Sequence, residues 1–313
     1  MRLSVLPGAL LCVAILGLCV PGNARAKEDA VYVYDLFREA NDCAELFARL
    51  RQLPLRPTVI LSVEQGPEFV LDRPNGETHL TCALRFLRGS SRKVKALFLQ
   101  DPIFLERSEE AVRRAALLGD YVARHPREFS GAQVDVEPHA GEKWEESNTD
   151  GRRRLLQNFH ELLRQVRPEL QGLPLSTAIP WWYPEVTQQF PQAAPQALFG
   201  VADELYLMVY GDAATPKPWN TAALRLAQIG GVKLFSGIGP IHLVLATYEF
   251  RSPAHLKGEL KKLRRALASK PNFAGTALFH ATSGFSAAPL GPFSSPKPPA
   301  GPRGALRGPV KED

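Results

Sequence analysis

Short apolar or β-branched runs alternate with amphipathic stretches along most of this chain. Side chains that alternate with period two are typical of strands, and apolar positions three or four apart are typical of helices. Eight runs predict strands, over residues 31–36, 57–63, 94–100, 131–137, 173–179, 203–210, 241–248 and 274–280. The stretches between them predict helices over residues 41–52, 107–124, 150–167, 219–229 and 253–269, with Asn41 and Asp150 as N-caps of the first and third.

Eight strand–helix units in about 250 residues predict an α/β fold, a (β/α)8 TIM barrel. The alternative is an open doubly wound sheet, which usually carries a glycine-rich turn after its first strand. Here the first strand runs into Asp35-Leu-Phe-Arg38, which has no glycine to cradle a phosphate. We therefore expect one barrel domain over residues 27–286.

The two ends of the chain differ from this pattern. Residues 1–26 resemble a secretory signal peptide, with Arg2, an apolar stretch over 3–20 and a small-x-small cleavage site at Ala24–Ala26. This predicts export to the periplasm or the cell exterior, without stable membrane insertion after cleavage. The alternatives are an uncleaved membrane anchor and a lipoprotein signal at Cys19. Residues 287–313 are rich in proline and glycine and predict a disordered tail.

The net charge of +6 is concentrated outside the predicted barrel. The signal segment and the tail each contribute two positive charges, so the barrel carries only two more. A nearly neutral barrel argues against nucleic acid as a partner, and we expect a monomer.

The cysteines and histidines do not suggest a metal. Cys43 and Cys82 remain after signal removal, and they either form a disulfide or stay as two buried thiols. No Cys/His group has metal-ligand spacing, so no metal or other cofactor is predicted.

The active site of such a barrel lies at the carboxyl ends of its strands. Those ends hold mainly carboxyl and aromatic groups, namely Asp35, Glu64, Asp101, Glu137, the segment 181–183, Tyr210, Glu249 and His280. Strand ends also become polar simply because they meet solvent. That alternative does not explain so many carboxyl groups at one mouth.

The fourth strand carries the strongest candidate for acid chemistry. Period two places Gln133, Asp135 and Glu137 on the face that lines the barrel interior, and Val134 and Val136 on the helix side. Two neighbouring carboxyl groups repel each other, so one pKa should rise and keep a general acid protonated. The alternative is a structural aspartate beside a solvent-exposed glutamate.

Residues 129–137 resemble the D-G-x-D-x-D-x-E signature of family 18 glycoside hydrolases. Asp135 and Glu137 match its last two acids, whereas Ser130 and Gln133 replace the first two. Tyr206–Tyr210 is similar to the family's M-x-Y segment. The resemblance implies Glu137 as general acid, Asp135 as the group that orients a nucleophilic 2-acetamido group of the substrate, and Tyr210 as a contact of that group. The family's S-x-G-G on strand 3 is absent.

The chain also resembles poorly characterised bacterial glycosidase-type barrels with an Asp-x-Glu-Pro-His/Tyr run followed by a tryptophan. Asp135–His139 and Trp144 fit this pattern, as do Ile179–Trp181 and His280. This second resemblance spans most of the barrel and implies no established substrate.

Glu249 at the end of the seventh strand supports a different chemistry. Glu137-Pro138 resembles the strand-4 Asn-Glu-Pro of the large retaining glycosidase clan, with Val136 in place of the asparagine. In that clan a strand-7 glutamate is the nucleophile, about 5–5.5 Å from the acid. Glu249 would then attack carbon.

All four tryptophans (144, 181, 182 and 219) fall in loops after the fourth to sixth strands. Flat rings stack on sugar faces, so Trp181, Trp182 and Trp219 are candidate platforms, with Asp35, Asp101 and His280 as further substrate-binding groups. Alternatively, these tryptophans pack the loops over the barrel. The predicted substrate is a poly- or oligosaccharide, N-acetylated as in chitin or peptidoglycan.

Two other classes of function stay open. The missing aspartates favour a carbohydrate-binding barrel without catalysis. A metal-dependent hydrolase or esterase would need a histidine-rich strand set or a G-x-S-x-G elbow, which the chain lacks.

Overall fold

A computed structural model describes residues 28–38, 40, 42–53, 56–210, 226, 234–235, 237, 239–250 and 252–279. Several predictions lie outside these residues: the signal segment 1–26, the tail 287–313, Asn41, Trp219, His280 and all of the helix 219–229 except residue 226.

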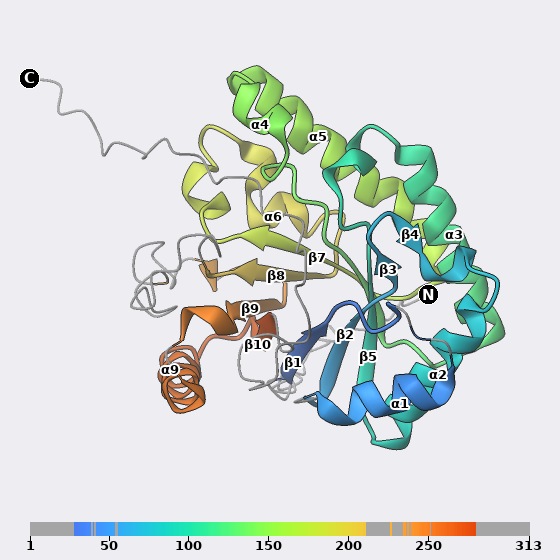
Figure 1. The fold of residues 1–313 in the computed structure, drawn as a ribbon. Coiled ribbons are helices and arrows are strands. Elements are labelled where there is room, and N and C mark those ends of the chain that lie inside the picture. Colours follow the sequence, from blue (N-terminus) through green and yellow to red (C-terminus); the bar gives the residue numbers. More distant parts are fainter. Residues whose placement is uncertain are drawn as a thin grey trace, which may run out of the picture.

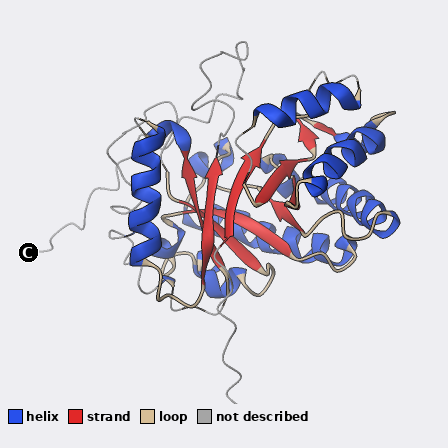
Figure 2. Cartoon of the chain, turned by 90° about the horizontal axis from the view of Figure 1, so that it is seen from below, coloured by secondary structure: helices blue, strands red, loops and turns tan. Residues whose placement is uncertain are grey.

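Eight parallel strands close into a barrel, which confirms the predicted fold. They are β1 (Glu28–Val33), β2 (Thr58–Ser62), β5 (Lys93–Phe98), β6 (Gly131–Val134), β7 (Leu175–Pro180), β8 (Glu204–Met208), β9 (Ile241–Ala246) and β10 (Phe273–Phe279). The order around the barrel is β1-β10-β9-β8-β7-β6-β5-β2, and β1 pairs with both β2 and β10. Figure 2 shows the strands in the middle of the molecule with helices on the outside.

The longer helices are α1 (Cys43–Gln52), α2 (Gly76–Gly89), α3 (Ser108–Arg124), α5 (Thr149–Val166) and α9 (Pro253–Ala266), and the shorter ones are α4 (Glu142–Glu146) and α6 (Pro195–Leu198). A small hairpin of β3 (Glu64–Gln65) and β4 (Glu68–Phe69) follows β2. The 3-10 turns are η1 (Val70–Asp72), η2 (Pro102–Leu105), η3 (Arg167–Leu170), η4 (Tyr183–Val186), η5 (Pro191–Ala193) and η6 (Thr247–Glu249). In Figure 1, α1 and α2 lie together on one side of the barrel and α9 lies on another.

The structure differs from the sequence predictions in its helices and in two of their N-caps. Helix α2 was not predicted, although its buried Leu80, Leu84 and Leu87 have helical spacing. Helix α1 is capped by Asp42, whose side chain accepts from the Glu45 N–H at 2.9 Å. Helix α5 is capped by Asn148 instead of Asp150, because the Asn148 side chain reaches the free N–H of Gly151.

A disulfide joins Cys43 of α1 to Cys82 of α2, with a Cα–Cα distance of 5.7 Å. The sequence alone left this pairing open. The bond links two neighbouring helices across 39 residues of chain.

Side chains of the strands alternate between two cores. Along β1, Val31 and Val33 pack outward under the helices, whereas Ala30 and Tyr32 pack inside the barrel. Gln133 of β6 donates to the Tyr32 hydroxyl at 2.5 Å. The predicted inward face of the fourth strand is therefore confirmed for Gln133.

Strand β6 is shorter than the predicted 131–137. Its ladder with β5 ends at the pair Phe98 and Val134. Leu99 then takes a positive φ of 54°, which turns the β5 chain away and removes the partner for further pairing. Asp135 and Glu137 consequently lie just past the strand, at the carboxyl-end mouth of the barrel.

Among the described residues, no helix combines the length and the apolar composition needed to cross a membrane.

Candidate active site at the barrel mouth

Asp135 and Glu137 form a coupled pair of carboxyl groups at the mouth. Burial raises the pKa of Asp135 well above its ordinary value, and the charge of Glu137 raises it further. Burial also raises the pKa of Glu137 to about 7. The Glu137 side chain keeps 28% of its surface exposed, so solvent reaches it. Such a pair retains a proton near neutral pH on a group that a substrate can touch.

Tyrosines surround the two carboxyl groups. Tyr34, just after β1, donates its hydroxyl to Asp135 Oδ2 at 3.4 Å. Tyr210, just after β8, stacks on Phe279 with ring centroids 5.2 Å apart. After burial, the charges of Glu137 and Asp135 raise the pKa of Tyr210 most, which places its phenol near both. The structure therefore brings Asp135, Glu137 and Tyr210 together.

His139 and Tyr183 complete the surroundings of Glu137. His139 Nε2 lies 3.6 Å from Glu137 Oε2. Burial lowers the pKa of His139 to about 4, so the ring is neutral above that pH. The Tyr183 ring is edge-on to His139 at 5.7 Å, and burial followed by the charge of Glu137 raises the pKa of Tyr183. The sequence places His139 in the Asp135–His139 run and Tyr183 in the segment 181–183 at the mouth, but predicts no catalytic role for either.

The tryptophans divide into two roles. Trp144 is only 6% exposed and packs in α4 against Phe190 and the Arg152 guanidinium, so it holds a loop in place. Trp182 is half-buried, and its ring lies 5.3 Å from His139 and 4.8 Å from Tyr183. Trp181 is half-buried, and its backbone N–H donates to the backbone carbonyl oxygen of Met208 at 3.0 Å. Trp182 thus lies beside the neighbours of Glu137. Trp181 and Trp182 both remain candidate platforms for a sugar ring.

The other predicted carboxyl groups have contacts of their own. Asp35 pairs with Arg38 at 3.6 Å, and exposed Asp101 caps η2 by accepting from the Ile103 N–H. Glu64 is buried and pairs with Arg114 at 2.6 Å, which is a structural role. Glu249 lies in η6 and is only 3% exposed. The contacts of Asp35 and Asp101 do not join them to Glu137.

No group of three or more His, Cys, Asp or Glu side chains within the described part of the chain is arranged to hold a metal ion. The carboxyl groups, phenols and imidazole at the mouth can transfer protons and form hydrogen bonds.

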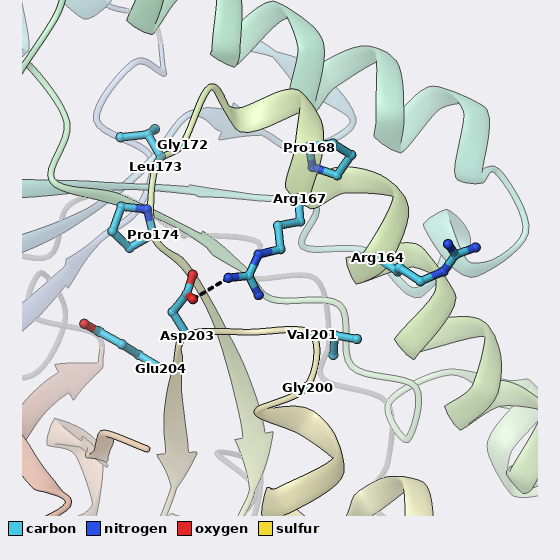
Figure 3. A pocket seen from close by; sticks show the side chains of 10 residues that line it. All are labelled: Arg164, Arg167, Pro168, Gly172, Leu173, Pro174, Gly200, Val201, Asp203 and Glu204. Carbon is cyan, nitrogen blue, oxygen red and sulfur yellow. Dashed lines mark hydrogen bonds and ion pairs between the residues drawn. The ribbon is translucent and has the colours of Figure 1, made fainter. Parts of the chain in front are cut away.

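A separate hollow of about 660 Å³ lies at the opposite, amino-terminal end of the strands (Figure 3). Arg167 reaches across it to pair with Asp203 at 2.5 Å, whereas Arg164 extends away. Glu204, at its edge, pairs inside the barrel with Lys95 and lies 3.3 Å from His242 Nε2. These charges are already paired, and this end of a barrel serves stability more than catalysis.

Comparison with protein-family models and with curated protein sequences gave no match. Among solved structures, the exo-β-1,4-mannosidase of Opitutaceae bacterium strain TAV5 is similar, with a TM-score of 0.53 and 11% identity over 80% of this chain and 51% of that chain. The chain spans about half the length of that mannosidase. A GH5_18 protein from Streptomyces cattleya, solved with Manβ1-4GlcNAc, is similar with a TM-score of 0.52 and 14% identity over 81% of this chain and 70% of that chain. These likenesses show a shared TIM-barrel fold.

Proposed function

We propose that this protein is a glycoside hydrolase with Glu137 as general acid and Asp135 as its partner. The observation that carries the proposal is the pair of half-buried carboxyl groups at the mouth of the barrel, each with a raised pKa. A pKa of about 7 keeps Glu137 protonated at mildly acidic pH, as donation of a proton to a leaving glycosidic oxygen requires.

The proposed substrate is an N-acetylated poly- or oligosaccharide. The resemblance of Asp135, Glu137 and Tyr210 to the family 18 signature supports it, because that chemistry uses the 2-acetamido group of the sugar as nucleophile. Asp135 would orient that group, Tyr210 would contact it, and Glu137 would protonate the leaving oxygen. The GH5_18 neighbour's ligand, Manβ1-4GlcNAc, also contains an N-acetylated sugar.

The rival chemistry uses Glu249 as a protein nucleophile. The fold shared with the exo-β-1,4-mannosidase keeps this reading open, since retaining enzymes place a second carboxyl group about 5–5.5 Å from the acid. A third candidate is a carbohydrate-binding barrel without turnover, which Ser130 and Gln133 in place of two aspartates would favour.

We also propose that the protein is exported and acts as a monomer. The Cys43–Cys82 disulfide supports export, because such bonds persist mainly in oxidising compartments.

The test is hydrolysis of labelled chito-, gluco- and manno-oligosaccharides by the wild type, Glu137→Gln and Glu249→Gln. Glu146→Gln, an exposed glutamate of α4, is the matched control. Substrate assistance predicts turnover of acetamido sugars only, lost in Glu137→Gln and retained in Glu249→Gln. If the wild type hydrolyses sugars that lack the acetamido group and both Glu137→Gln and Glu249→Gln lose this activity, the rival chemistry is established. If the wild type binds a sugar and none of the four proteins hydrolyses it, the binding barrel is established.

A further inference from the structure

His139 is the one imidazole in the described residues that contacts the Glu137 carboxyl group. Its Nε2 lies 3.6 Å from Glu137 Oε2, and the rings of Trp182 and Tyr183 pack edge-on against the imidazole. A small side-chain rotation would bring this pair within hydrogen-bond distance, and such contacts are often long in structures without substrate.

The other ring nitrogen decides which tautomer is present. His139 Nδ1 is buried and has no hydrogen-bond partner among the described residues. A buried N–H without an acceptor is rarer and more costly than a buried acceptor without a donor. The neutral ring should therefore leave Nδ1 bare and carry its hydrogen on Nε2, facing Glu137.

We propose that His139 is a positioning residue, whose Nε2–H donates to Oε2 of Glu137 and thereby leaves the acid proton on Oε1, directed toward the substrate. This inference rests on the proposed function of Glu137 as the acid. The same donor serves both forms of Glu137, because Oε2 is the carbonyl oxygen of the acid and an oxygen of the carboxylate. No proton moves on the imidazole during the reaction.

Among the described residues, the other titratable groups that interact with Glu137 carry no positive charge. They are the Asp135 carboxyl group after β6, the Tyr32 phenol on β1, the Tyr34 phenol after β1, the Tyr183 phenol in η4 and the Tyr210 phenol after β8. A neutral N–H donor stabilises the carboxylate more than the acid, so its loss should raise the pKa of Glu137 further.

The first test compares His139→Phe with His139→Gln in the full chain. Phenylalanine keeps the ring and its burial but removes the N–H, whereas the glutamine amide can replace the donor. We expect His139→Phe to lower kcat about 10- to 100-fold with little change in KM, and to move the basic limb of the pH–rate profile to higher pH. His139→Gln should restore the limb and most of kcat. His160→Phe, at a half-buried histidine of α5 that contacts the Gln192 carbonyl, is the control.

If His139 only packs, His139→Phe should lower stability without moving the basic limb of the pH–rate profile, and this result overturns the proposal. A His139→Phe variant with the wild-type basic limb and the wild-type kcat also overturns it. The second test needs no variant to fold. Nitrogen-15 NMR of histidine-labelled wild type should show His139 with hydrogen on Nε2 and none on Nδ1 between pH 5 and pH 8; the reverse tautomer overturns the proposal. Absence of any sugar turnover would instead overturn the proposed function, while the NMR result still decides the contact.

Discussion

Individual side chains at the mouth of the barrel work against the stability of the fold. Asp135 and Glu137 are both held where ionisation is unfavourable, with no cation in contact among the described residues. Period two along the predicted strand 131–137 predicts that both side chains face the barrel interior and that one pKa rises; in the structure both acids lie past the end of β6 and both pKa values rise. The roles of His139 and Tyr183 could not be predicted in the same way, because they depend on how two loops pack against each other. The resemblance to family 18 covers Asp135, Glu137 and Tyr210; the second resemblance includes His139 in its Asp135–His139 run but implies no role for it.

Glu137→Gln should therefore stabilise the protein at high pH. The folded protein holds the Glu137 proton more tightly than the unfolded chain, so the stability that this proton contributes is present below pH 4.5 and is lost as pH rises through about 7. At pH 8 the variant should unfold with a free energy about 1–3 kcal/mol higher than the wild type, and at pH 4.5 the difference should be much smaller. Urea unfolding at the two pH values measures this. Glu146→Gln is the control. If Glu137→Gln is no more stable than the wild type at pH 8, Glu137 ionises in the folded protein without cost.

The backbones of β1 and β10 approach each other closely where these two strands pair to close the barrel. A Cβ on Gly275 of β10 would lie 1.9 Å from the backbone oxygen of Glu28 on β1. The eight strands themselves were predictable from their apolar runs, to within a few residues at most ends. The end of β6 was not, because it depends on the turn of Leu99 in a neighbouring strand. Helix α2 does not follow β2 directly, because the β3–β4 hairpin and η1 lie between them. The simple alternation of strand and helix therefore does not predict it.

Gly275→Ala should separate β1 from β10 and destabilise the fold by about 2–4 kcal/mol, because backbone atoms must shift to make room. Gly258→Ala on α9 is the matched control. A Cβ there meets nothing within 4 Å, so alanine should stabilise the helix by about 0.5–1 kcal/mol. Thermal unfolding of both variants measures the contrast. A Gly275 variant as stable as the control would mean that the two strands do not approach so closely.

The whole molecule separates its charges between two ends of one barrel. The carboxyl-end mouth holds the coupled acids, whereas the amino-terminal end holds the buried Lys95–Glu204 pair with His242 beside it. The count of strands was sufficient to predict this overall architecture. It could not predict the buried ionic group, because Lys95, Glu204 and His242 come from three strands that are far apart in the sequence.

Glu204→Gln should leave Lys95 buried without its anion and cost about 3–5 kcal/mol of stability. Since this group lies at the end of the barrel away from Glu137, kcat measured well below the melting temperature should stay close to the wild-type value. Chemical unfolding together with kinetics checks both halves. Loss of turnover in a variant that is still folded would mean that the two ends are coupled.

The most direct test of the whole account is the rate of chito-oligosaccharide hydrolysis by the wild type and by Glu137→Gln, both as the full chain, at mildly acidic pH. We expect measurable turnover by the wild type and a loss of about 10²- to 10⁴-fold in the variant, because the general acid is gone. Equal rates in the two proteins, or no turnover of any oligosaccharide by the wild type, would contradict the assignment of Glu137 as the acid of a glycoside hydrolase.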